Sequence, residues 1–241
     1  MSGGRIFTDE ELQAMTNNEL DQLAKNLNGN EKAQELLKTI EGLNDGMRVA
    51  YMDFTAAVLG YIQDSMGSDA FEESVRRYGE VFMKPLYLQS HSTDDWMKSW
   101  KEEPNMKTFK NLIMEIAATI RVQSGRGFKK VEEDDEKITM RVAPCGSGGR
   151  MRRSGHYGPP YNFPRVKGPH HLTFGHSDFP HYCQHCAILY ARMPIEMDGA
   201  LWPVIEPDET DQGQCTFYFY KDPKDIPEEY YTRVGKKKVI K

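Results

Sequence analysis

The chain has 241 residues, of which 39% are hydrophobic and 28% charged, and its formal net charge is −5. This length buries an adequate core in one large domain or two small ones, and the composition excludes an intrinsically disordered chain. The negative charge argues against general nucleic-acid affinity, and no run approaches the roughly 20 apolar residues that span a bilayer. The N-terminus lacks a signal-peptide core, so we expect a cytoplasmic protein with reduced thiols and no membrane partner.

The first half of the sequence has the pattern of helices throughout. Thr8-Asp-Glu-Glu11 and Thr16-Asn-Asn-Glu19 match the capping box and predict two short helices. A longer helix is predicted over residues 31–66, ended by Gly67, because apolar residues recur at alternating steps of three and four. This apolar seam consists of Ile40, Leu43, Met47, Ala50, Phe54, Ala57 and Tyr61. We interpret the seam as core packing or a homodimer contact, not as a cofactor site.

Three further helices complete this half. One covers residues 69–83 before Pro85, a short one is capped by Thr93, and another runs over residues 106–124. We therefore expect residues 1–126 to form a helical bundle that scaffolds the rest of the chain and forms a homodimer through its long helix.

The period of the apolar residues changes at Gly127. Four strands and one helix are predicted beyond it, over residues 128–133, 137–143, 181–192 (the helix, ended by Pro194), 201–206 and 214–220. Residues 144–180 contain six prolines, which predicts a long irregular loop of functional importance. The expected fold is α+β: an N-terminal helical bundle, then a small mixed α/β metal-binding domain over residues 127–241 with a long irregular loop.

All four cysteines lie in this second part, at Cys145, Cys183, Cys186 and Cys215. Reduced thiols grouped in this way are typical ligands of zinc, or alternatively of a 4Fe–4S cluster. Cys183 and Cys186 lie three residues apart at a predicted helix start, so their sulfurs share one face. We expect them to hold a metal with Cys215 and with Cys145 or Glu206. A redox pair and two buried thiols are the alternative interpretations.

A glycine-rich turn and three arginines directly follow the first cysteine. Converging backbone amides and guanidinium groups predict a site for a small anionic substrate such as a carboxylate. The predicted substrate-binding residues are Gly146, Ser147, Gly148, Arg150, Arg152 and Arg153. The turn lacks the Lys-Ser/Thr ending of a P-loop, which excludes ATP. A solvated loop balanced by the acidic residues 132–136 is the alternative.

Six of the seven histidines also lie between Cys145 and Cys215. Imidazole titrates near neutrality and therefore suits a general base. His176 and His181 precede the predicted metal helix closely, so we predict that they move protons. His185 lies between two cysteines and supports the metal interpretation. Cys145 is alternatively a catalytic nucleophile.

A broader pattern runs from Tyr182 to Phe219. A cysteine opens a helix, a strand ends at Glu206, and Cys215-Thr-Phe217 begins the last strand. This order resembles the 4-vinyl reductase-type domain and the L-2-amino-thiazoline-4-carboxylate hydrolase-like proteins, although their middle cysteine has no counterpart between Pro207 and Gly213. The resemblance implies a small organic molecule bound near a metal, in a family divided between sensing and hydrolysis.

Together these features predict a metal-dependent hydrolase or lyase that acts on a small carboxylate-bearing molecule. Two alternatives stay open at this point. One is a small-molecule-binding sensor module with a structural zinc site, since four cysteines can close a zinc site completely. The other is a thiol enzyme that uses Cys145.

Overall fold

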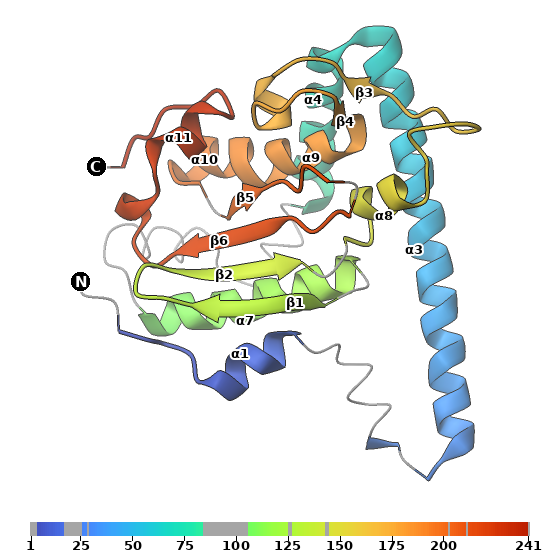
Figure 1. Cartoon of the computed structure of the whole chain (residues 1–241), viewed down its shortest axis with the longest axis vertical. Helices are drawn as coiled ribbons and strands as arrows, with labels where there is room; N and C mark the ends of the chain where they lie inside the picture. Colours follow the sequence, from blue (N-terminus) through green and yellow to red (C-terminus); the bar gives the residue numbers. More distant parts are fainter. Residues whose placement is uncertain are drawn as a thin grey trace.

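The computed structural model describes residues 4–16, 26–27, 29–83, 106–124, 127–142, 145–201, 203–210 and 212–240. Within these residues the fold is mixed α/β, with a long N-terminal helix and a small antiparallel sheet (Figure 1). Most of the helix predicted to begin at Thr16, and all of the helix predicted to begin at Thr93, lie outside the described residues. Among the helices that are described, none is long and apolar enough to cross a membrane.

The main sheet has four antiparallel strands in the order β1-β2-β6-β5. Their bounds are β1 Phe128–Glu133, β2 Lys137–Val142, β5 Val204–Glu206 and β6 Thr216–Tyr220. β1 and β2 form the predicted hairpin, and the Asp134 carboxylate accepts the backbone N–H of Lys137 at the turn (2.8 Å). Alternate residues of β2, namely Ile138, Met140 and Val142, are buried, as expected for a strand with one face on the core.

Local sequence rules account for the helices of the first half. Their bounds are α1 Asp9–Thr16, α3 Glu31–Met66, α4 Ser68–Tyr78 with a following π-helical turn Gly79–Met83, and α7 Met106–Ser124. The capping box of α1 is confirmed, because Thr8 N–H donates to Glu11 Oε2 (2.9 Å) and Glu11 N–H donates to Thr8 Oγ1 (3.2 Å). α3 ends at Gly67 as predicted, and the φ of +86° at this glycine allows the chain to turn into α4.

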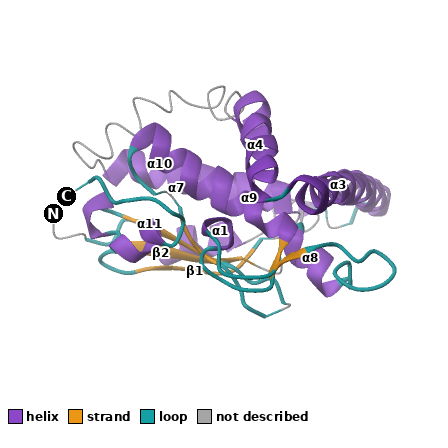
Figure 2. Cartoon of the chain, turned by 90° about the horizontal axis from the view of Figure 1, so that it is seen from above, coloured by secondary structure: helices purple, strands orange, loops and turns teal. Residues whose placement is uncertain are grey.

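These helices divide between two hydrophobic cores. α1 and α7 pack with the sheet, and Phe109, Ile113 and Phe219 are central to that core. α3 and α4 pack instead with a helical segment of the second half, through residues such as Phe71 and Ile188. The apolar face of the sheet must be buried by other elements, and α7 lies on the same side of the sheet as α10 (Figure 2). Within the described residues, the first-half helices therefore do not form the single bundle that we predicted.

The helical segment of the second half runs without a break from His181 to Asp198. It comprises a 3-10 turn His181–Cys183, α9 Gln184–Ala187, a π-helical turn Ile188–Arg192 and α10 Met193–Asp198. We predicted that Pro194 ends this helix, and the prediction is wrong. The N–H of Met193 donates to the carbonyl of Ile188, five residues back, and this wider turn accommodates a proline that lacks an N–H.

The long loop is largely irregular, as predicted, but it contains four short elements. They are α8 Gly148–Arg153, β3 Arg165–Val166, a 3-10 turn His171–Thr173 and β4 Phe179–Pro180, with β3 and β4 paired. The C-terminal segment after β6 is folded as well. It holds a 3-10 turn Pro223–Asp225 and α11 Glu228–Thr232, and Tyr231 and Val234 are fully buried.

Glu72 on α4 connects three elements by charge-assisted hydrogen bonds. Its carboxylate accepts Arg76 Nε (2.8 Å) and Arg192 Nε (2.9 Å), and lies 3.2 Å from His171 Nε2. Glu72→Ala would remove the acceptor that Arg192 Nε and Arg76 Nε share, although Arg76 keeps its pair with Glu196. We expect it to lower the free energy of unfolding by about 2–3 kcal/mol in urea denaturation. Glu73→Ala is the matched control. It breaks an exposed pair with Arg77, so its effect should stay within about 0.5 kcal/mol.

The same contacts predict a pH dependence. Burial raises the pKa of Glu72, but the hydrogen bonds of Arg76 and His171 and the charge of Arg192 outweigh it and lower this pKa to about 2. The folded-state pKa lies below the unfolded one, so the stabilisation is complete above about pH 5 and disappears as the pH falls toward 2. The stability difference between wild type and Glu72→Gln should shrink over this range. A difference that is constant from pH 7 to pH 2 would contradict the assignment.

Candidate functional site

A cavity of about 460 Å³ lies between α3, α4, α8, the His181–Asp198 helical segment and the sheet. Apolar and aromatic side chains form most of its wall, as is typical of small-molecule sites. All four cysteines, Cys145, Cys183, Cys186 and Cys215, line this one cavity. The four cysteines therefore gather in space, although they come from three separate segments of the chain.

Backbone pairing positions two of these cysteines. The N–H of Cys145 donates to the carbonyl of Gly213 (2.8 Å), and the N–H of Val142 donates to the carbonyl of Cys215 (3.0 Å). These bonds continue the contact between the ends of β2 and β6, so the two thiols lie at the same end of the sheet. The Sγ of Cys145 also lies 3.2 Å from Ser147 Oγ.

Three of the four thiols are held in their protonated form. Burial, followed by the charges of Cys215 and Cys145, raises the pKa of Cys183, and burial likewise raises the pKa of Cys186. Burial and then the charge of Cys145 raise the pKa of Cys215 to about 11. Each thiolate would thus disfavour the others unless a cation joined them. Within the described residues, which include all four cysteines, no three Cys, His, Asp or Glu side chains are grouped so as to hold a metal ion.

Among the histidines that the structure describes, His185 is the one on the cavity wall. Its Nδ1 contacts the carbonyl oxygen of Tyr182, which can only accept, so Nδ1 carries the proton and Nε2 presents a lone pair. Nε2 lies 3.4 Å from the Sγ of Cys186. Burial lowers the pKa of His185, which keeps the ring neutral, the form in which Nε2 can accept a proton. In the sequence, the signal for His185 was its position between two cysteines, but we predicted His176 and His181 as the proton carriers.

Those predicted proton carriers do not line the cavity. His181 is fully buried, with Nδ1 3.0 Å from the carbonyl oxygen of Pro164 and Nε2 2.8 Å from that of Ala56, so it ties the long loop to α3. His176 lies near the surface, 3.3 Å from a carboxylate oxygen of Glu209. The predicted ligand Glu206 is also away from the cavity wall, because its carboxylate accepts Arg233 Nη1 (3.0 Å).

The glycine-rich turn serves close packing. A side chain on Gly148 would place its Cβ 2.7 Å from the Sγ of Cys183. A side chain on Gly149 would place its Cβ 2.9 Å from the Cα of Gly213, so two backbone segments are in close contact there. Of the turn residues predicted to bind an anion, Ser147 and Gly148 line the cavity and Gly146 is buried outside its wall.

The three predicted arginines hold α8 in place. Arg150 pairs with Asp53 of α3, Arg152 donates to the carbonyl of Asp208 (2.9 Å), and Arg153 donates to those of Gln212 (2.7 Å) and Cys145 (3.0 Å). Of the three arginines, only Arg152 lines the cavity. We predicted substrate contacts for all three, because basic residues next to a glycine turn favour that role. Most of the carbonyl groups that they contact lie about sixty residues away along the chain, so the local sequence gives no sign of these contacts.

Arg48 of α3 is a cavity residue that sequence reasoning missed. One end of its guanidinium is engaged, since Nη2 donates to Asp45 Oδ1 (2.7 Å). Its Nη1 is buried and has no hydrogen-bond partner among the described residues. A buried charged donor without an acceptor is costly, and a bound anion would satisfy it.

Comparisons with protein-family models, with curated proteins and with solved structures found no match to this chain. The resemblance of residues 182–219 to the 4-vinyl reductase-type domain therefore stays a prediction.

Proposed function

We propose that this chain is a metal-dependent hydrolase or lyase whose cavity binds a small, largely apolar molecule with one carboxylate group. The observation that carries this proposal is the gathering of four thiols from separate segments on one cavity wall. Thiols that line a cavity are open to oxidation. Several cysteines gathered at one place in a protein usually serve to bind a thiophilic metal. The apolar wall and the unpartnered Arg48 Nη1 support the substrate class.

The donor chemistry fits zinc, or alternatively a 4Fe–4S cluster, with Cys145, Cys183, Cys186 and Cys215 as ligands. Because no three donors of the described residues are grouped as they stand, the side chains would have to turn toward one point. A bound zinc ion would supply a Lewis acid for a carbonyl group or a water molecule.

The residues of the chain supply binding and proton transfer. The apolar wall excludes water from the bound molecule, and Arg48 Nη1 donates to its carboxylate. The lone pair on His185 Nε2 accepts the proton that hydrolysis or elimination releases, while the Tyr182 carbonyl holds the opposite side of the ring.

Metal analysis of the full chain, purified without oxygen, tests this proposal. We expect about one zinc ion per chain in a colourless protein, and Cys183→Ser should weaken zinc binding by at least about 100-fold. Glu206→Gln is the control, because Glu206 pairs with Arg233 outside the cavity, and it should keep the wild-type affinity. A brown protein would assign the cluster instead. Wild-type protein without any bound metal would refute metal dependence.

A further inference from the structure

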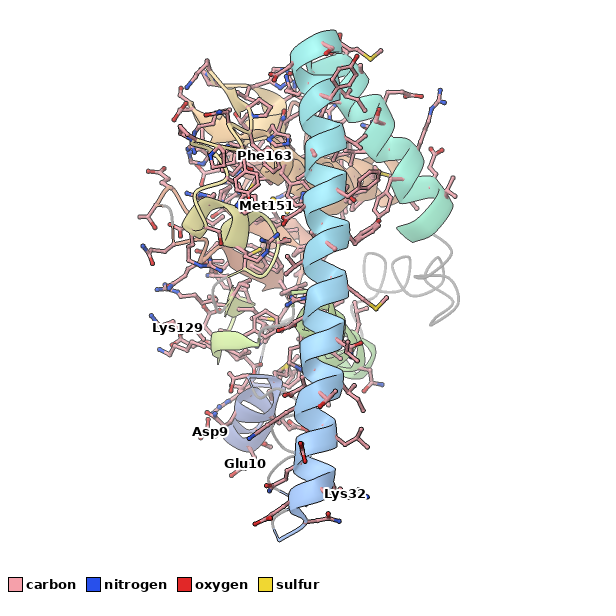
Figure 3. The ribbon with its side chains drawn as sticks, turned by 90° about the vertical axis from the view of Figure 1, so that its right-hand side faces the viewer. Asp9, Glu10, Lys32, Lys129, Met151 and Phe163 are labelled. Atoms are coloured by element: carbon pink, nitrogen blue, oxygen red, sulfur yellow. The ribbon has the colours of Figure 1, made fainter. Side chains whose placement is uncertain are left out.

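α3 carries two apolar faces. On one side Ala56, Leu59 and Gly60 are buried against the rest of the described chain, where a side chain on Gly60 would press on His181 and Pro164. On the opposite side every residue of the apolar seam, from Ile40 to Tyr61, is exposed. Figure 3 looks onto α3, with Met151 and Phe163 beside one half and Lys32 near the far end.

The exposed seam is large. Met47, Phe54 and Tyr61 leave 74%, 70% and 71% of their surface exposed, and Leu36 extends the seam by one step at its N-terminal end. Monomeric proteins rarely leave contiguous apolar patches of more than a few hundred Å² in water. From Leu36 to Tyr61 the seam is about 38 Å long, which is enough to reach the roughly 800 Å² per partner of a stable interface. A face of this size calls for a partner.

The spacing of the seam specifies what kind of partner fits. Its steps alternate strictly between three and four residues, which is a period of 3.5. A straight helix has 3.6 residues per turn, so a seam with this shorter period stays aligned only against another helix that winds around it. Among the described helices, α3 alone carries such a seam in exposed form, since the apolar residues Phe109, Ile113 and Ile116 of α7 are buried in the main core.

We propose that α3 pairs with α3 of a second copy of this chain, in antiparallel orientation. If the twofold axis passes between Arg48 and Val49, every seam position of one copy meets a seam position of the other. The layers formed are Leu36 with Tyr61, Ile40 with Ala57, Leu43 with Phe54, and Met47 with Ala50, each occurring twice by symmetry. The seam is therefore complementary to itself, as a twofold interface requires.

Side-chain size and charge favour antiparallel over parallel pairing. The antiparallel register places the small Ala50 and Ala57 against the larger Met47 and Ile40, so that these layers have similar volume. A parallel register would stack alanine on alanine and Phe54 on Phe54, which alternates voids with crowding. At the ends, the antiparallel register brings exposed Lys32 close to Asp64 of the second copy, whereas the parallel one pairs like charges.

α3 packs on the second core through Ala56 and Leu59, on the side opposite the seam. The lower part of α3 stands clear of the other described elements, and the loop between α8 and β3 reaches past its upper part (Figure 1), so a second copy can approach along the lower part. Tyr51 borders the seam and also lines the cavity, so the dimer contact adjoins the candidate site. This inference does not depend on the metal or on the proposed reaction.

Sedimentation velocity of the full chain tests the proposal. We expect a dimer of twice the 27.7 kDa chain mass, and Met47→Glu combined with Phe54→Glu should weaken it at least about 100-fold and give a monomer at micromolar concentration. Both side chains are exposed, so the variant should keep the wild-type circular dichroism spectrum. Lys38→Glu adds negative charge on an exposed position away from the seam and should stay dimeric. A monomeric wild type, or a variant that stays dimeric, overturns the proposal.

A photo-crosslink determines the orientation with the seam otherwise unchanged. Benzoylphenylalanine in place of Leu36 should crosslink between copies to the peptide that contains Tyr61, as read by mass spectrometry. An intermolecular crosslink to the peptide around position 36 would overturn the antiparallel register. A crosslink within one monomer would mean that another segment of the same chain covers the seam, and would overturn the dimer.

Discussion

Gly213→Ala should lower the free energy of unfolding by about 3 kcal/mol or more. The added Cβ would lie 2.4 Å from the Cα of Gly149, a backbone atom that moves only if α8 moves with it. The φ of Gly213 is +66°, so the alanine would also occupy the left-handed region. Urea denaturation followed by circular dichroism measures the change, and the cavity wall that Gly213 shares with the cysteines should be displaced.

Gly155→Ala separates these two contributions. Gly155 has a φ of +72°, but no atom of the described residues beyond its chain neighbours lies within 4 Å of the place that an added Cβ would take, so only the backbone preference applies. We expect a cost of about 1 kcal/mol for it. If the two variants lost the same stability, the close approach of the two backbones would not constrain this part of the fold.

Arg48→Met should abolish the preference of the cavity for an anion. In the wild type, naphthalene-2-carboxylate should bind about 10–100-fold more tightly than its neutral carboxamide, because a carboxylate satisfies the unpartnered Arg48 Nη1. Methionine keeps much of the length of the side chain and removes the donors, so both probes should bind the variant equally. Isothermal titration calorimetry with the two probes gives the ratio directly.

Two controls accompany this experiment. The stability of Arg48→Met should stay within about 0.5 kcal/mol of the wild type, because the substitution releases only the exposed Asp45 and removes a buried donor without a partner. Arg77→Met removes a cation from the exposed face of α4 and should keep the preference. An unchanged carboxylate preference in Arg48→Met would assign anion recognition to another residue or exclude it.

Local rules in the sequence were sufficient for most element boundaries. The capping box at Thr8 and the glycine at position 67 act within one helical turn, so their effect is visible without knowledge of the fold. Pro194 shows the limit of such rules. Whether a proline ends a helix depends on the preceding turn, and the π-helical turn that accommodates it reflects packing of Ile188 and Met193 in the second core.

The candidate site was predictable in part. Cysteines are few and chemically distinctive, and their grouping in the sequence pointed to one region of the fold. Arg48 had no such signal, because its role arises only when α3 packs beside segments that follow a hundred residues later. His181 and His176 were chosen for closeness along the chain, whereas the direction of a side chain decides what it can reach.

The wall of the cavity draws on segments from Arg48 to Phe217, which has a consequence for biosynthesis. Contacts between residues so distant along the chain form late, because the loop between them must first be closed. Until β6 leaves the ribosome, the cavity wall is incomplete. The thiols of Cys145, Cys183 and Cys186 then stay accessible to oxidants and to chaperones. The order of synthesis thus makes the segment of Cys215 and β6 the last part of the cavity wall to be added.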